Sequence, residues 1–190
     1  MSYELIIEQA KDKVTEKDFD QALNLFNQAL EINTKGKEAL YERGVLYTNL
    51  SQLELALFDF NKLIEIENDN SFYYACRAYV KTELKDISGA IADYEITLKF
   101  NPDDALTLNN LGLLQEQLGF KSQAEKSFTK SNNVLGYNPE RKRSKSNKNN
   151  SNKSDSPTSK AVFKSVLTSK KGFKEFINFI KNGFKIKDND

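Results

Sequence analysis

A single period of about 34 residues recurs between position 3 and position 138 of this sequence. At each recurrence an aromatic residue follows an alanine by four positions, and a small residue lies 12 positions before that alanine. Self-similarity at a fixed period is typical of architectures that stack one supersecondary unit on the next. Four copies run without insertion or deletion, at 3–36, 37–70, 71–104 and 105–138. They are marked by the small residues Ala10, Gly44, Ala78 and Gly112, the alanines Ala22, Ala56, Ala90 and Ala124, and the aromatics Phe26, Phe60, Tyr94 and Phe128.

The pattern inside each copy predicts two helices joined by a short turn. In the third copy, residues 71–84 and 87–100 carry apolar side chains at three- and four-residue spacing, as helices with one buried face require. A small residue at the eighth position of each copy, on the first helix, lets the alanine at the twentieth position, on the second helix, pack closely against it. We therefore expect Gly44→Leu or Ala90→Leu to overpack the contact, at a cost of roughly 1–3 kcal/mol.

Capping patterns place the starts of the second helices. Asp18 precedes Gln21 by three positions, and Ser51 precedes Glu54 in the same relation. Both pairs predict a capping box, in which the first side chain accepts a backbone hydrogen bond at the start of the helix.

This pattern resembles the tetratricopeptide repeat family, whose unit has the same period. Family positions 8, 20 and 24 match in all four copies, whereas position 7 departs in the first three, with Gln9, Arg43 and Arg77 before the expected Leu111. Only the third copy has the family proline, Pro102. The resemblance covers residues 3–138 and implies an all-α fold, a right-handed α-solenoid of four helix–turn–helix repeats.

The resemblance also implies a function, because tetratricopeptide arrays are typically scaffolds that bind peptides or proteins in a concave groove. The groove is lined by the first helix of each repeat, and here those positions combine carboxylates with aromatic side chains. Such a groove suits a basic, apolar peptide or helix. The implied groove residues are Glu8, Glu38, Tyr41, Glu42, Val45, Phe72, Cys76, Tyr79, Asn109, Asn110 and Leu113.

Catalytic chemistry has little support in these residues. The chain has no histidine, and its one cysteine, Cys76, lacks an imidazole partner. No glycine-rich phosphate loop is present, so we expect a protein that is not an enzyme and that uses no cofactor, metal or small-molecule substrate. The single cysteine and a first segment unlike a signal peptide predict a cytoplasmic location.

Charge is distributed unevenly along the chain. Residues 1–138 hold 14 Lys/Arg and 22 Asp/Glu, whereas residues 139–190 hold 14 Lys/Arg and 5 Asp/Glu. Residues 139–158 contain no large apolar side chain, which predicts a disordered basic linker. This linker also has no aromatic residue for base stacking, so nucleic acid is not an expected partner.

Apolar patterning resumes in residues 159–187, which predict one or two amphipathic helices. One face there would carry Phe173, Phe176, Ile177, Ile180 and Phe184 among lysines. Three interpretations stay open for this tail. It docks on the chain's own repeats as a cap or an autoinhibitor, it docks on a second chain, or it binds an anionic membrane surface or an acidic partner.

Overall fold

The computed structural model describes residues 1–137, and they divide between two compact units. Unit 1 is Met1–Phe100, and unit 2 begins at Asn101. The predicted linker 139–158, the predicted helical segment 159–187 and its stripe from Phe173 to Phe184 lie outside the described residues.

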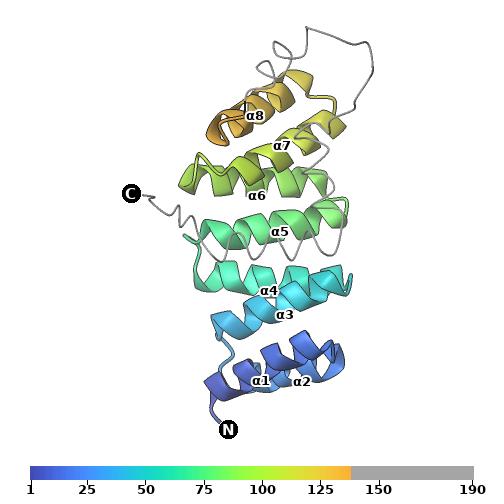
Figure 1. Cartoon of the computed structure of the whole chain (residues 1–190), viewed down its shortest axis with the longest axis vertical. Coiled ribbons are helices and arrows are strands. Elements are labelled where there is room, and N and C mark those ends of the chain that lie inside the picture. The colour runs from blue at the N-terminus through green and yellow to red at the C-terminus, as the bar shows by residue number, and fades with distance from the viewer. Residues whose placement is uncertain (138–190) are drawn as a thin grey trace, which may run out of the picture. The chain divides into compact units, whose positions relative to one another are not determined.

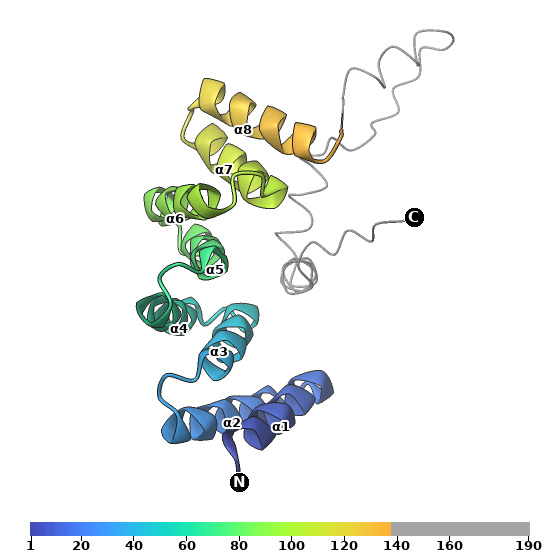
Figure 2. The ribbon, with the colours of Figure 1, turned by 90° about the vertical axis from the view of Figure 1, so that its left-hand side faces the viewer.

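Unit 1 consists of three helical hairpins that follow one another along the chain (Figure 1). Within this unit, α3 and α5 lie on one side and α4 and α6 on the other (Figure 2). The first helices of consecutive repeats are therefore neighbours, as the predicted repeat requires. The helices are α1 (Tyr3–Glu16), α2 (Phe19–Ile32), α3 (Lys37–Asn49), α4 (Leu53–Ile66), α5 (Ser71–Glu83) and α6 (Ile87–Phe100).

Unit 2 contains a fourth hairpin of α7 (Ala105–Gln117) and α8 (Lys121–Val134). Asp104 caps α7, since its carboxylate accepts hydrogen bonds from the backbone N–H groups of Leu106 and Thr107 at 3.0 and 3.1 Å. Among the described residues every regular element is a helix. The predicted all-α class with four helical hairpins is thereby confirmed.

Repeating small and aromatic residues form the core of each hairpin. Ala22, Ala56 and Ala90 have no exposed surface, and neither do Phe26 and Phe60. The two repeat glycines lie against the aromatic ring of their own hairpin. A methyl group on Gly44 would lie 3.3 Å from the Phe60 ring, and one on Gly112 would lie 2.7 Å from Phe128. The Phe128 ring is thus the nearest group to Gly112, whereas at Gly44 the Cβ of Asp59, at 3.2 Å, lies as near as the Phe60 ring.

The turn inside each hairpin has the same backbone conformation in all four repeats. A residue with a positive φ stands at the end of the first helix, as the C-cap in the first repeat and directly after the C-cap in the other three: Lys17 at 65°, Ser51 at 61°, Lys85 at 67° and Gly119 at 82°. In each case the next residue donates its N–H to a carbonyl five positions earlier, for example Gln52 to Tyr47 at 2.8 Å. This arrangement is a Schellman motif, which ends the helix.

The shared turn explains why one capping prediction is right and the other wrong. Asp18 is the N-cap of α2 and accepts a hydrogen bond from the Gln21 N–H at 3.3 Å, as expected. Ser51, in contrast, takes the left-handed position that ends α3, so it is unable to begin α4. Gln52 is the N-cap of α4 instead, and it makes no side-chain capping bond.

One side chain joins the first two hairpins of unit 1. Gly36 is the N-cap of α3 and has no side chain with which to satisfy the exposed N–H groups of the first turn. The hydroxyl of Tyr3 on α1 accepts a hydrogen bond from the Ala39 N–H at 3.2 Å. A residue in the first repeat thus caps a helix of the second.

Candidate functional site

Every residue of the predicted groove lies on the first helix of its repeat. Unit 1 supplies Glu8 from α1, Glu38, Tyr41, Glu42 and Val45 from α3, and Phe72, Cys76 and Tyr79 from α5; α7 of unit 2 supplies Asn109, Asn110 and Leu113. The two units are described separately below. The name acidic–aromatic face is used for Glu8, Glu38, Tyr41, Glu42 and Phe72 of unit 1.

Aromatic rings join α3 to α5 within this face. The ring centroids of Tyr41 and Phe72 are 5.3 Å apart with the planes tilted by 50°, and Phe72 lies 6.0 Å from Tyr73. Tilted aromatic pairs at such distances contribute attraction beyond the area that they bury. Phe72 is half-buried, so part of this cluster is still accessible.

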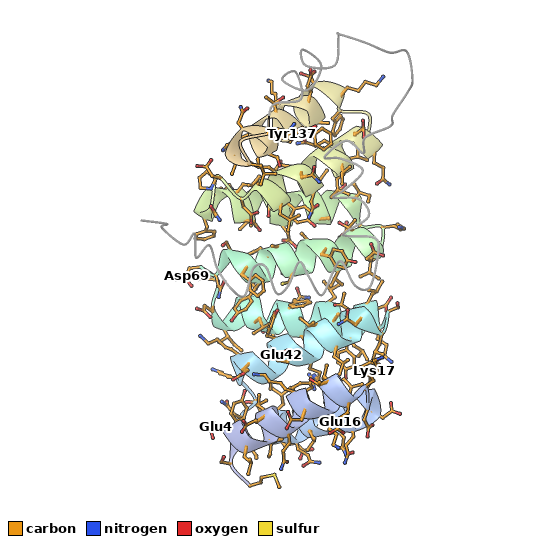
Figure 3. All side chains as sticks on the ribbon, viewed as in Figure 1. Glu4, Glu16, Lys17, Glu42, Asp69 and Tyr137 are labelled. Carbon is orange, nitrogen blue, oxygen red and sulfur yellow. The ribbon has the colours of Figure 1, made fainter. Side chains whose placement is uncertain are left out.

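Carboxylates lie on the first helices of the same unit as the aromatic cluster. Glu8 and Glu38 are exposed and Glu42 is half-buried; Glu42 is labelled on α3 in Figure 3. Lys11 of α1 donates a hydrogen bond to Glu38 and links the first two repeats. Burial opposes the charge on Lys11, but Glu38, Glu42 and Glu8 together raise the pKa of its ammonium above the usual value. Lys11 is thus bound to a carboxylate of the acidic–aromatic face.

A second polar link involves Tyr73 of the aromatic cluster. Lys37 donates to Glu67 at 2.9 Å, and the Tyr73 hydroxyl donates to the same carboxylate at 3.4 Å. The hydrogen bond from Lys37 lowers the pKa of Glu67. Burial and the neighbouring charge of Glu67 raise the pKa of Tyr73 to about 12, so this tyrosine is neutral at physiological pH.

Several predicted groove residues are buried in the structure. Tyr41 and Tyr79 expose 7% and 9% of their surface, and Asn109 and Asn110 expose 2% and 4%. Cys76 is a fully buried free thiol. Val45 and Leu113 are half-buried. Their role in binding a ligand remains a prediction.

The structure also reveals a network that the sequence analysis missed. Arg43 of α3 donates two hydrogen bonds to the carboxylate of Asp59 on α4, at 2.9 and 2.6 Å, and a third to Asn27 on α2 at 2.5 Å. Arg77 repeats the arrangement one unit further along the chain, with Asp93 at 2.8 and 2.6 Å and Asn61 at 2.8 Å. Each arginine therefore joins its own hairpin to the preceding one.

This network explains why position 7 departs from the family pattern in the second and third repeats. In both, an arginine takes the place of the expected apolar residue, and its partners lie 16 positions before and 16 positions after it. The Asn–Arg–Asp spacing recurs with the period of the repeat, and that recurrence is the signal that could have revealed it. Asp59 has no exposed side-chain surface, and burial raises the pKa of its carboxyl despite the opposing effect of Arg43.

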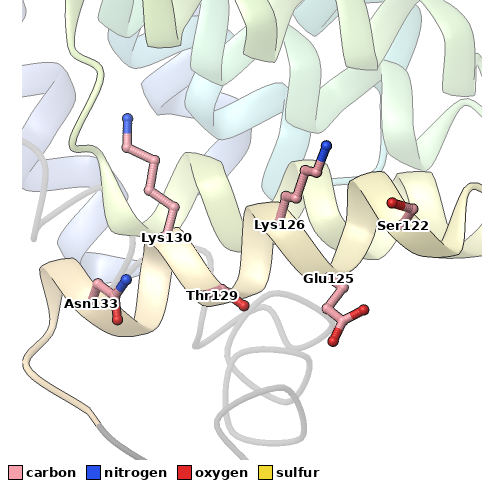
Figure 4. Close-up of a pocket in the computed structure, with 6 residues that line it drawn as sticks. All are labelled: Ser122, Glu125, Lys126, Thr129, Lys130 and Asn133. Carbon is pink, nitrogen blue, oxygen red and sulfur yellow. The ribbon is translucent and has the colours of Figure 1, made fainter.

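Unit 2 has a different, polar surface on α8. A surface hollow there is lined by Ser122, Glu125, Lys126, Thr129, Lys130 and Asn133 (Figure 4). All six residues are exposed, as are Lys121 and Gln123. This side of the last described helix is thus polar and solvated.

The described part of the chain contains no cluster of three or more metal-ligating side chains. Within residues 1–137, no helix is long and apolar enough to cross a bilayer.

Comparison with known proteins supports the repeat assignment. The tetratricopeptide repeat model matches residues 37–70, which is the second predicted repeat. This match confirms the predicted resemblance to the tetratricopeptide repeat family in the second repeat.

Curated relatives share part of the sequence, and solved structures share the fold. The BBSome complex member bbs-4 of Caenorhabditis elegans is 27% identical over 65% of this chain and 35% of its own length. BBSome complex member BBS4 of Bos taurus is 29% identical over 62% of this chain and 22% of its own length. The chain therefore spans about a fifth to a third of these relatives. Among solved structures, the MamA protein superposes with a TM-score of 0.67 at 18% identity, over 70% of this chain and 73% of that one.

Some of the relatives are named as enzymes. Human serine/threonine-protein phosphatase 5 is 29% identical over half of this chain, but the match takes in only 19% of the phosphatase. The shared part is the repeat fold, which typically serves as a non-catalytic scaffold for protein–protein interaction.

Proposed function

We propose that this chain is a non-catalytic scaffold whose acidic–aromatic face binds a basic, apolar peptide or helix. The observation that carries the proposal is the pairing of Tyr41 with Phe72 across α3 and α5, with the carboxylates of Glu8, Glu38 and Glu42 on first helices of the same unit. Aromatic side chains supply the contact area of a binding site, and exposed carboxylates steer a cationic partner toward it.

The direct test is a titration of the full chain with a labelled synthetic peptide of residues 170–187, which is basic and amphipathic. Phe72→Ala should weaken binding about tenfold or more, equivalent to roughly 1.4 kcal/mol. Phe58→Ala is the matched control, because Phe58 is 54% exposed and lies on α4, a second helix. Equal losses in the two variants, or no loss in Phe72→Ala, would refute the proposal.

Ionic strength provides a second readout of the same face. Exposed charges are screened over about 8 Å at physiological salt, so peptide affinity should fall as salt is added. A peptide with its lysines replaced by glutamate should not bind. If the acidic peptide binds as well as the basic one, carboxylate steering plays no part.

The C-terminal segment enters the proposal as a ligand supplied by the protein itself, docking on the repeats of its own chain or of a second chain. The alternative is a recruitment module, in which the basic amphipathic tail binds an anionic membrane surface or an acidic partner. Co-sedimentation with phosphatidylserine-containing vesicles at low salt tests the membrane form, and the absence of co-sedimentation would remove it.

A further inference from the structure

The second helix of the second repeat carries two large apolar side chains on its solvent side. Leu55 and Phe58 of α4 expose 49% and 54% of their surface. The opposite side of this helix is the buried one, with Ala56, Asp59, Phe60 and Leu63. The fold of the hairpin therefore leaves about half of each apolar side chain to solvent.

The other repeats show that the fold does not require these side chains. Leu55 and Phe58 stand at positions 19 and 22 of their repeat, where the other repeats have polar or small residues. Those residues are Gln21 and Asn24 in α2, Gly89 and Ala92 in α6, and Gln123 and Lys126 in α8. In contrast, the exposed apolar residues Ile32, Phe100 and Val134 share position 30 and recur with the period. An apolar pair that departs from the period at solvent-facing positions indicates contact with another molecule.

Charged side chains flank the pair on the same side of α4. Glu54 precedes Phe58 by four positions, and Lys62 follows it by four. The Lys62 ammonium lies 5.8 Å from the centre of the Phe58 ring and donates to Glu65 at 2.7 Å. Glu54 is exposed, and within residues 1–137 its carboxylate makes no hydrogen bond or ion pair. Glu54, Leu55, Phe58 and Lys62 are named here the α4 ridge.

We propose that the α4 ridge is a homodimer contact, in which two copies of this chain pair through antiparallel α4 helices with Phe58 on the two-fold axis. In such a pair, a residue before the axis lies opposite the residue that follows the axis by the same distance. Lys62 of each copy would thus meet Glu54 of the other, and the symmetry makes this contact twice. Leu55 would pack beside the Phe58 ring of the other copy, and the two rings would meet at the centre.

Self-complementarity is what favours a second copy over another partner. An isologous contact needs an acid and a base at equal distances on either side of its centre, and the α4 ridge has both. The lysine-rich C-terminal segment suits the acidic–aromatic face better, because the ridge offers it one acid and one base. The side chains of Lys62 and Glu65 are 45% and 63% exposed, so Lys62 exchanges Glu65 for Glu54 at little cost.

The size of the ridge sets the strength of the contact. A single helix ridge is small compared with the interfaces of stable dimers, and small interfaces belong to the weak and transient class. The chain should therefore be a monomer at low micromolar concentration and associate only when it is concentrated.

The dimer goes beyond the scaffold function and leaves it intact. The α4 ridge lies on a second helix, whereas the acidic–aromatic face lies on first helices of the same unit. Both copies would therefore keep this face open, and a ligand with two binding segments would engage both. Linked binding of this kind raises the overall affinity by about 10²–10⁴.

The test is sedimentation equilibrium of the full chain between about 1 µM and about 1 mM. We expect the average mass to rise with concentration from the 21.7 kDa of one chain toward twice that value. Phe58→Ala should raise the dissociation constant of the dimer about tenfold or more. Phe100→Ala is the matched control, because Phe100 is 52% exposed but stands at the recurring position, and it should change nothing.

Charge exchange tests the antiparallel pairing itself. Glu54→Lys places two lysines opposite each other and should weaken the dimer about tenfold, because the contact occurs twice. Glu54→Lys/Lys62→Glu restores opposite charges and should recover most of the affinity. Glu31→Lys, at an exposed glutamate on α2, makes the same change in net charge as Glu54→Lys and should have little effect.

Three outcomes would overturn the proposal, once circular dichroism shows each variant folded. They are the mass of one chain at every concentration, unchanged association in Phe58→Ala, and a Glu54→Lys/Lys62→Glu variant as weak as Glu54→Lys alone. Association that survives Phe58→Ala but is lost in Phe176→Asp/Ile180→Asp would assign the contact to the C-terminal segment instead. Peptide binding by the Phe58→Ala variant tests the scaffold function independently, since that variant keeps the acidic–aromatic face.

Discussion

Removal of Arg43 should reveal how strongly the buried Asn–Arg–Asp network holds the repeats together. The substitution Arg43→Met keeps an unbranched side chain of moderate length but deletes all three hydrogen bonds. Asp59, which has no exposed side-chain surface, then loses both of its hydrogen bonds from Arg43. Breaking a buried pair by removing one partner typically costs about 3–5 kcal/mol, because the remaining charge is left uncompensated.

That loss is a large fraction of the roughly 5–15 kcal/mol that typically holds a domain folded. Urea denaturation followed by circular dichroism measures it directly. With a slope of about 1–3 kcal/mol per molar urea, the midpoint should fall by at least about 1 M. The double variant Arg43→Met/Asp59→Leu should recover most of the loss, since apolar replacement of a whole buried pair is often neutral or stabilising.

An exposed ion pair provides the matched control for the buried network. Lys62→Met breaks the exposed pair with Glu65, whose two side chains are 45% and 63% exposed, and should cost under about 1 kcal/mol. If Arg43→Met costs no more than Lys62→Met, or if the double variant is worse than the single one, the network does not contribute as described.

The pH dependence follows from the raised pKa of Asp59. A carboxyl whose pKa is higher in the folded state than in the unfolded state binds more protons when folded, so its contribution to stability falls as pH rises through the folded pKa. Without Arg43, this pKa should rise further above its usual value of 3.8. The deficit of Arg43→Met relative to the unmodified chain should thus be greatest near neutral pH and shrink as the pH falls toward that value.

The hairpin turns and the helix contacts yield three further predictions. Lys85→Gly should stabilise the chain by roughly 0.5–1 kcal/mol, because relief of a left-handed backbone, about 1–2 kcal/mol, exceeds the entropic cost of glycine. Gly119→Ala should destabilise the chain by about 1 kcal/mol, because alanine would have to adopt the positive φ of Gly119. Equal melting temperatures for the Lys85→Gly and Gly119→Ala variants would contradict the argument. Gly44→Leu should cost roughly 1–3 kcal/mol, since even a methyl group there lies 3.3 Å from Phe60; an unchanged urea midpoint would show that the core has room.

Capping could be predicted from sequence only where the backbone agreed with the pattern. Asp18 is the N-cap of α2, as predicted, because the turn before it leaves it in a suitable conformation. Ser51 has the right side chain, but the Schellman turn that ends α3 gives it a positive φ. A local pattern does not include the hydrogen bonds of the preceding helix, and those bonds decided this position.

The residues of the acidic–aromatic face were predicted only from their positions within the repeat. Periodicity assigns Tyr41 and Phe72 to first helices, and the structure adds that their rings meet at 5.3 Å. It also adds that Lys11 is held by Glu38, which no local pattern indicates, because the two residues come from different repeats.

The sequence by itself determined the helical hairpins and their order, because a hairpin is specified by contacts between residues close together in the chain. The period of the sequence then repeats those contacts four times. Only the tertiary structure decided how the departures from the period are accommodated. Arg43 and Arg77 replace apolar residues, and each is tolerated because two neighbouring helices bring an aspartate and an asparagine to it. A buried charge requires partners whose positions depend on how helices pack, and packing is a property of the folded chain as a whole.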